Sequence, residues 1–142
     1  MPEPLEVATR ALARRDYSER ELRNRLARAG VESAAAEEAL GALRERGLLD
    51  DSRFAAQRAE ALAERGRGDA AIRFELERQG VSAELIDEAV ASLAPERDRA
   101  EGIVSRRGPG PKTARLLAQR GFDPELVALA AERPLRRSRD QR

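Results

Sequence analysis

The chain contains no cysteine, no histidine and no tryptophan, and aromatic residues make up 3% of its 142 residues. Without thiols or imidazoles it cannot form a disulfide, a thiolate or imidazole metal site, or a catalytic centre that uses those groups. It also lacks an apolar signal core near its first residue and any apolar run approaching the roughly 20 residues of a membrane span. These absences predict a cytoplasmic protein without membrane contact that is not an enzyme, holds no metal and needs no cofactor.

Residues that favour β-structure are also scarce, since Val, Ile and Thr together number only 11. Ala, Leu, Arg and Glu instead account for 88 residues, and all four are strong helix formers. Ala and Leu must supply most of the core, because the chain has only 3 Phe and 1 Tyr. The composition therefore predicts an all-α fold.

The sequence repeats itself at an offset of 50 residues, and a shorter third copy follows at a further offset of 41. A period of this length is typical of proteins built from tandem structural repeats. It predicts three tandem three-helix repeats, helix-turn-helix-like, in an elongated, curved array. The matched sets are Leu22, Leu26, Gly30 and Val31; Ile72, Leu76, Gly80 and Val81; and Leu117, Gly121 and Phe122. We expect repeats at residues 1–50, 51–94 and 95–132, followed by a basic flexible tail at 133–142.

Apolar positions within each repeat recur at the spacing of one helix face, and polar residues mark the helix ends. Ser18 and Glu21 form a capping box, and Gly30, Gly80 and Gly121 stand where a left-handed helix stop is needed. Ser82 and Asp123 are placed to cap the helices that follow. The expected helices cover residues 4–15, 18–29, 33–46, 51–65, 69–79, 83–94, 96–107, 112–120 and 124–132.

The formal net charge of +1 conceals an uneven distribution of charge along the chain. Residues 1–102 carry 17 Arg and 22 acidic residues, whereas residues 103–142 carry 10 basic and 4 acidic residues. The segment from Ile103 to Gly121 has no acidic residue and five basic ones, Arg106, Arg107, Lys112, Arg115 and Arg120. This segment predicts a surface for a polyanion or an acidic protein, and an ordinary solvated face is the alternative.

Several short motifs have a simpler structural interpretation. Asp50-Asp51 opens an expected helix, so we interpret the pair as an N-cap and a charge that favours the helix dipole rather than as a metal site. Residues 66–71 fit G-x-G-x-x-A without a preceding strand, and residues 110–113 lack the spacing of a phosphate loop. The acidic third helices of the first two repeats disfavour insertion into the major groove of DNA.

Longer motifs resemble a known family. The stretch Gly47-Leu48-Leu49-Asp50-Asp51-Ser52-Arg53-Phe54-Ala55, with Ser18-Glu19-Arg20-Glu21-Leu22 before it and Gly80-Val81-Ser82 after it, is similar to the bacterial RecX regulatory proteins. Arg120-Gly121-Phe122 resembles the signature of that family's third repeat. The resemblance extends from about residue 5 to residue 132.

This resemblance implies a cytoplasmic protein of tandem three-helix repeats that binds the RecA recombinase in the groove of its filament on single-stranded DNA. It implies modulation of RecA, usually inhibition of its ATP hydrolysis, strand exchange and co-protease activity, in DNA repair, recombination and the SOS response. The resemblance also implies direct contact with single-stranded DNA, and we expect a monomer. The expected contact residues are Arg20, Arg23, Arg28, Arg65, Arg67, Arg73, Arg78, Arg115 and Arg120.

Two other functions fit the same residues. One is a non-catalytic helical-repeat protein that binds nucleic acid without RecA, and the other is an interaction scaffold for a different acidic partner. Salt dependence separates these possibilities, because affinity dominated by phosphate contacts falls steeply as the salt concentration rises.

Overall fold

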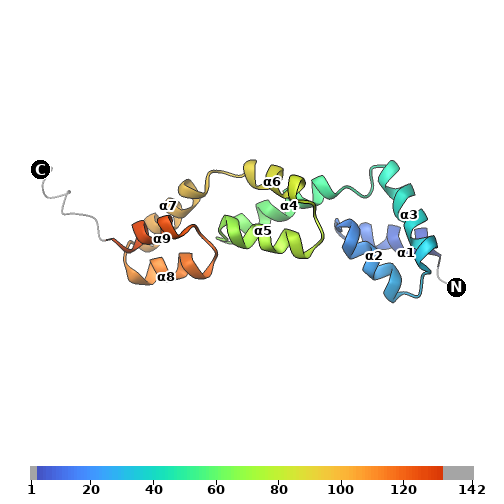
Figure 1. Cartoon of the computed structure of the whole chain (residues 1–142), viewed down its shortest axis with the longest axis horizontal. Coiled ribbons are helices and arrows are strands. Elements are labelled where there is room, and N and C mark those ends of the chain that lie inside the picture. Colours follow the sequence, from blue (N-terminus) through green and yellow to red (C-terminus); the bar gives the residue numbers. More distant parts are fainter. Residues whose placement is uncertain (1–2, 133–142) are drawn as a thin grey trace, which may run out of the picture. The chain divides into compact units, whose positions relative to one another are not determined.

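The computed structural model describes residues 3–132, which form nine α-helices and no strand (Figure 1). The expected tail at 133–142 lies outside the described residues. The all-α prediction is confirmed, and each expected helix is present with ends that differ by at most three residues. The helices are α1 (Pro4–Leu12), α2 (Glu19–Arg28), α3 (Ser33–Glu45), α4 (Asp51–Glu64), α5 (Asp69–Arg78), α6 (Ala83–Ala91), α7 (Glu96–Arg107), α8 (Pro111–Gln119) and α9 (Pro124–Ala131).

The predicted capping side chains at the starts of α2 and α9 are confirmed. Ser18 Oγ accepts a hydrogen bond from the Glu21 amide at 3.1 Å, and the Glu21 carboxylate accepts one from the Ser18 amide, which completes the capping box. The Asp123 side chain accepts from the Glu125 amide at 2.8 Å at the start of α9. Side chains at these ends therefore satisfy amides that the helix itself leaves unpaired.

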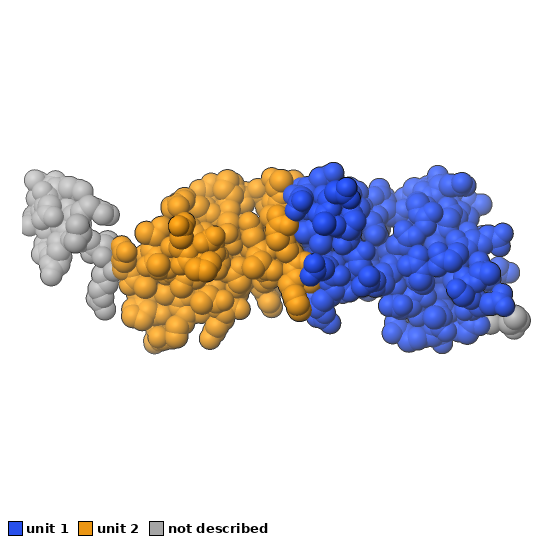
Figure 2. All heavy atoms as spheres, in the orientation of Figure 1, with its two compact units in different colours: residues 1–58, 75–89 blue, residues 59–74, 90–142 orange. Residues whose placement is uncertain are grey.

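The chain divides into two compact units, residues 1–58 with 75–89 and residues 59–74 with 90–142, coloured blue and orange in Figure 2. In the first unit, α1, α2 and α3 pack against one another around a core of small and branched aliphatic side chains and one tyrosine. Its members are Ala8, Ala11, Tyr17, Leu22, Leu26, Val31, Ala36, Leu40, Leu43 and Leu49. Leu22 and Leu26 are fully buried, as their helical spacing predicts.

In the second unit, α7, α8 and α9 enclose a smaller core. It consists of Ala100, Ile103, Ala114, Leu117, Phe122, Leu126 and Ala130. Phe122 is the aromatic member of this core and is buried. Burial of these aliphatic and aromatic groups is what holds three short helices together, because none is long enough to be stable alone.

Within the first unit, the start of α2 is tied to residues from the second repeat. The Asp51 carboxylate, on the first residue of α4, accepts a hydrogen bond from the Glu19 amide at 2.8 Å. Ser18 Oγ donates to the Gln79 carbonyl at 2.8 Å, just after the end of α5. Residues at the start of α2 therefore bind a carboxylate from the start of the next repeat and a carbonyl just after that repeat's second helix.

The second unit contains matching hydrogen bonds at the start of α5. We call the contacts at the start of α2 the first joint and those at the start of α5 the second joint. The Glu96 carboxylate, on the first residue of α7, accepts from the Asp69 amide at 2.8 Å. The Gly68 amide donates to the Arg120 carbonyl at 2.7 Å, just after the end of α8. The repeat seen in the sequence is thus also a repeat of hydrogen bonds between successive three-helix motifs.

An arginine reinforces each joint. Arg53 in α4 donates to the Asp16 carboxylate at 3.1 Å and to the Gly47 carbonyl at 3.1 Å. Arg99 in α7 donates to the Ala94 carbonyl at 2.9 Å, to the Arg67 carbonyl at 3.0 Å and to the Asp69 carboxylate. The hydrogen bond from Arg53 to Asp16 raises the pKa of the Arg53 guanidinium further above its already high ordinary value, so this group is charged at neutral pH.

Candidate functional site

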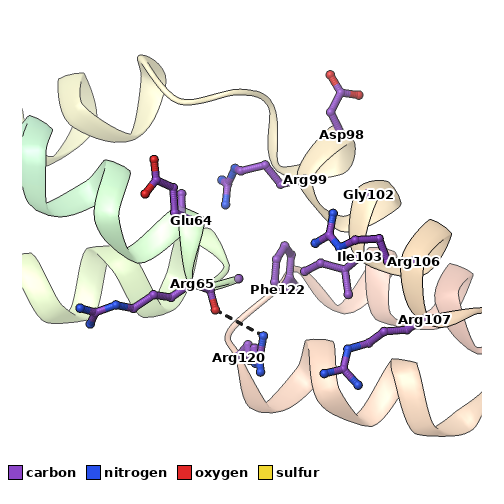
Figure 3. A pocket seen from close by; sticks show the side chains of 12 residues that line it. Glu64, Arg65, Asp98, Arg99, Gly102, Ile103, Arg106, Arg107, Arg120 and Phe122 are labelled. Carbon is purple, nitrogen blue, oxygen red and sulfur yellow. Dashed lines mark hydrogen bonds between the residues drawn. The ribbon is translucent and has the colours of Figure 1, made fainter.

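The second unit contains a hollow of about 510 Å³ (Figure 3). It lies where the C-terminal end of α4, the inner face of α7 and the turn after α8 meet. We call it the arginine hollow. Its lining residues are Ala63, Glu64, Arg65, Gly66, Asp98, Arg99, Gly102, Ile103, Arg106, Arg107, Arg120 and Phe122.

The floor of the arginine hollow is apolar and the wall beside it is held by backbone contacts. Ile103 and Phe122 are each 5% exposed and belong to the core of the second unit. Arg120 Nη1 donates to the Arg65 carbonyl at 3.3 Å, which is the dashed line in Figure 3. Gly66 has a φ of +83°, and a Cβ there would meet the Arg120 guanidinium at 2.5 Å, so glycine keeps this wall open.

The charge of the lining is strongly positive. Five arginines face two acidic residues, Glu64 and Asp98. Arg99 is neutralised by its bond to Asp69. Within residues 3–132, no carboxylate forms an ion pair with the other four, Arg65, Arg106, Arg107 and Arg120. The hollow therefore concentrates guanidinium groups that are available to an anion from outside.

Figure 3 shows how these side chains are directed. Arg106 and Arg107 extend from α7 toward the hollow, and Arg120 approaches from the turn below. The Arg65 side chain and the Asp98 carboxylate point away from it. Three guanidiniums from two chain segments thus border one space above an apolar floor.

The nine arginines expected as contact residues are divided between the two units. Arg65 and Arg120 line the hollow, and the Arg67 carbonyl anchors Arg99 at its edge. Arg73 on α5 and Arg115 on α8 are exposed in the same unit. The remaining four, Arg20, Arg23, Arg28 and Arg78, belong to the first unit.

Two of the four arginines in the first unit already have structural roles. Arg23 donates to Glu37 at 2.5 Å and lies 3.4 Å from Glu19. The hydrogen bond raises the pKa of Arg23 and lowers the pKa of the Glu37 carboxylate. Arg20 packs on Gly80, where a Cβ would come within 2.7 Å of the Arg20 Cβ.

The other two differ in their surroundings. Arg78 lies 3.7 Å from Glu75 and its side chain is 64% exposed. Arg28 is exposed near the end of α2. Both therefore remain accessible to a partner, and Arg78 would exchange only a weak surface ion pair for that contact.

Sequence reasoning placed Arg106 and Arg107 in the acid-free basic segment but did not include them among the contact residues. The run of basic residues without a nearby acid was the available signal for both. Arg99 was missed, and the signal would have been its place in the first turn of α7, one residue further from the helix start than Arg53 in α4. The expectation that Asp50 is an N-cap is confirmed, since its carboxylate accepts from the Ser52 amide at 2.9 Å.

Asp51 has a role beyond the favourable helix charge expected for it. Its carboxylate is partly buried against the start of α2, and this burial raises its pKa despite the hydrogen bond from the Glu19 amide. Among the described residues there is no group of three or more acidic side chains that could hold a metal ion. Within residues 3–132 no helix is long and apolar enough to cross a membrane.

Comparison with known proteins places these features in a family. Residues 5–43 match the model of the first three-helix domain of RecX, and residues 50–90 match that of the second. The chain is 37% identical over 136 residues to the regulatory protein RecX of Halorhodospira halophila, covering 89% of this chain and 84% of that one. It is 41% identical over 133 residues to the regulatory protein RecX of Chromohalobacter salexigens, covering 87% and 88%.

The chain belongs to the RecX family. The crystal structure of RecX from Lactobacillus salivarius superposes with a TM-score of 0.75 at 15% identity, over 89% of this chain and 91% of that one. A second crystal structure of a regulatory protein RecX gives a TM-score of 0.73 at 19% identity, over 90% and 72%. At these identities the two structures support the all-α helical-repeat fold of this RecX protein.

Proposed function

We propose that this RecX protein binds the RecA recombinase and its filament on single-stranded DNA and inhibits the ATPase, strand-exchange and co-protease activities of RecA. The observation that carries the proposal is the 37–41% identity to regulatory RecX proteins over more than four fifths of both chains. The protein acts without catalysis of its own, as a cytoplasmic monomer in DNA repair and recombination and the SOS response. Three repeats, residues 1–50, 51–94 and 95–132, are its building blocks.

The surface chemistry supports this proposal. A filament on DNA presents phosphate groups and acidic side chains, and guanidinium groups bind both with paired hydrogen bonds. Of the nine proposed contact residues, five are exposed and form no ion pair with a carboxylate of the described residues: Arg20, Arg28, Arg65, Arg67 and Arg115. Arg20 packs on Gly80, and the Arg65 and Arg67 carbonyls accept hydrogen bonds from Arg120 and Arg99, so Arg28 and Arg115 are the best residues for a first test.

The proposal is tested by measuring ATP hydrolysis by the cognate RecA on single-stranded DNA while this protein is titrated in, with DNA in excess and at fixed salt. We expect inhibition at well below one copy per RecA, because a protein that caps or lodges in a filament acts on many subunits at once. Competition for bare DNA cannot act at that ratio when DNA is in excess. Full ATPase activity at equimolar protein would overturn the proposal.

Matched variants connect the inhibition to the surface. The double variant Arg28→Ala/Arg115→Ala should need more protein for half-inhibition, by about tenfold. Arg46→Ala/Arg97→Ala removes the same charge from two exposed positions outside the nine and should change half-inhibition less than about twofold. Equal losses in both pairs would show that net charge, rather than these contacts, governs the effect.

A second candidate function is nucleic-acid binding without RecA, which the acid-free segment from Ile103 to Gly121 and the arginine hollow favour. In that case bare single-stranded DNA should bind tightly, with an affinity that falls by about 0.7 powers of salt for each phosphate contact. Tight, salt-sensitive DNA binding together with an unaffected RecA ATPase would favour this second function.

A further inference from the structure

We propose that Phe74, on α5, is the apolar anchor with which this protein docks into a pocket on the surface of the recombinase. The inference rests on the proposed function and goes beyond it by naming the side chain that gives the contact its specificity. The occupant of this surface is the RecA protein itself, and not the DNA strand in its filament.

Phe74 differs from every other aromatic residue of the chain in its exposure. Tyr17, Phe54 and Phe122 are 8%, 3% and 5% exposed, whereas Phe74 is 61% exposed. These four are all the aromatic residues that the chain has. An apolar ring gains free energy only when it is removed from water, so Phe74 contributes little to the packing of the free protein.

The sequence repeat shows that the fold does not need an apolar side chain at this position. The offsets of 50 and 41 residues align Phe74 with Asn24 in the first repeat and with Arg115 in the third. Both of these polar residues are exposed. Phe is also a weaker helix former than Arg, so it brings no advantage to α5 itself. Neither packing nor helix formation explains Phe74, and burial against a partner does.

The neighbours of Phe74 in the second unit leave its ring accessible. Ala70 lies one helical turn before it, is exposed, and carries only a methyl group. Arg73, the preceding residue, is exposed and is one of the nine proposed contact residues. Aromatic and arginine side chains are the types that dominate the binding energy of protein interfaces. Phe74 therefore has the surroundings of an interface anchor.

The charge of α5 favours a protein over a nucleic acid as the partner of Phe74. The helix carries three acidic residues and two arginines. Aromatic residues that stack on the bases of a single strand lie in positively charged grooves that hold the backbone. A helix with more carboxylates than guanidiniums does not provide such a groove, whereas a protein surface offers groups of both signs to pair with it.

The anchor is tested with variants of the full chain in the titration of RecA ATP hydrolysis on single-stranded DNA. Phe74→Ala removes the ring and should raise the concentration for half-inhibition at least about tenfold. Phe74→Leu keeps an apolar side chain for the pocket and should raise it less than about threefold. Leu129→Ala is the matched control, because Leu129 is a 50% exposed apolar residue on α9, and should change it less than about twofold.

Two further measurements distinguish a protein pocket from a DNA base. Phe74→Ala removes no charge, so the inhibition should keep the same dependence on salt concentration. Binding of bare oligo-dT should be equal for the unaltered protein and for Phe74→Ala. If Phe74→Ala and Phe74→Leu instead lose oligo-dT binding to the same extent, the ring stacks on a base and the proposal is wrong.

The outcomes separate the anchor from the proposed function. If the unaltered protein inhibits RecA and Phe74→Ala inhibits it equally well, the anchor is wrong and the proposed function stands. If the unaltered protein does not inhibit RecA, both are wrong. Sedimentation of the protein alone provides a last check, because a self-associated species that Phe74→Ala converts to a monomer would mean that the ring contacts a second copy and not RecA. Unchanged urea midpoints for all three variants would show that lost inhibition is not lost folding.

Discussion

Residues of one type carry out different tasks in this molecule, and their neighbours decide which. Arg53 and Arg99 use their guanidiniums to bind carbonyls and carboxylates of the preceding repeat. Arg107, eight residues after Arg99, belongs to the hollow and has no such partner among the described residues. Acidic residues show the same division, because Asp50 caps its own helix while Asp51 binds an amide of another repeat.

Asp51 provides a test of the first joint. Asp51→Ala leaves the Glu19 amide without its acceptor and should lower the free energy of unfolding by about 1–2 kcal/mol. Asp51→Asn retains an oxygen acceptor and should cost less than half as much. Urea denaturation at pH 7 measures both. Equal losses would mean that the charge of Asp51, rather than its hydrogen bond, stabilises the joint.

The same pair of variants predicts a pH dependence. Burial raises the pKa of Asp51, so protonation favours the folded state. The part of its contribution that depends on protonation is therefore largest below its ordinary value of 3.8 and is lost as the pH rises through the raised pKa, whereas the hydrogen bond from the Glu19 amide still contributes at pH 7. Glu75 behaves in the opposite way, because hydrogen bonds from Gln79 and Arg58 outweigh burial and lower its pKa, so its contribution is lost as the pH falls below 4.5. Asp51→Asn should remove only the first of these two effects from the pH profile of the urea midpoint.

At the scale of the helix, the ends matter as much as the buried faces. Gly30, Gly80 and Gly121 all have φ between +83° and +88° and stop the second helix of each motif. Gly30 has nothing within 4 Å of its missing Cβ, whereas Gly121 lies against Ala71 in the second joint. The glycine that recurs in the sequence repeat therefore only ends a helix in the first motif, whereas in the third it ends a helix and also allows close contact with Ala71.

This difference predicts unequal effects of the same substitution. Gly30→Ala should cost about 1 kcal/mol for the left-handed backbone alone. Gly121→Ala carries the same cost, and its Cβ would also lie 2.7 Å from the Ala71 Cβ and 2.8 Å from the Ala71 nitrogen. We therefore expect at least about 2–3 kcal/mol for Gly121→Ala, because backbone must move. Thermal unfolding of both variants checks this, and equal shifts would contradict the close contact in the second joint.

The buried helix faces give a simpler prediction. Leu76 is fully buried on α5, and Leu76→Ala should lower the free energy of unfolding by about 2–5 kcal/mol. Phe74 on the same helix is 61% exposed, so Phe74→Ala is the control and should change stability by less than about 0.5 kcal/mol. An unchanged urea midpoint for Leu76→Ala would contradict the core assignment.

At the scale of the whole molecule, the sequence predicted what depends on local periodicity. The helical spacing of apolar residues located all nine described helices, and the offsets of 50 and 41 residues located the matching glycine stops. The joints could not be predicted in this way, because Asp51 and Glu19 are 32 residues apart and no local rule pairs them. The arginine hollow was predicted only in part, since its wall depends on a hydrogen bond between Arg120 and Arg65 across 55 residues.

The pattern of the joints also governs how such a chain can grow. In both joints the amide of the first residue of a helix, Glu19 in α2 or Asp69 in α5, donates to an acid from the following motif. The corresponding first residue of α8 is Pro111, whose nitrogen carries no hydrogen. A motif added after α9 would find no donor for its acid there. Adding a further motif with the same hydrogen bond, by duplication or design, would therefore require replacing Pro111 by a residue that has an amide hydrogen.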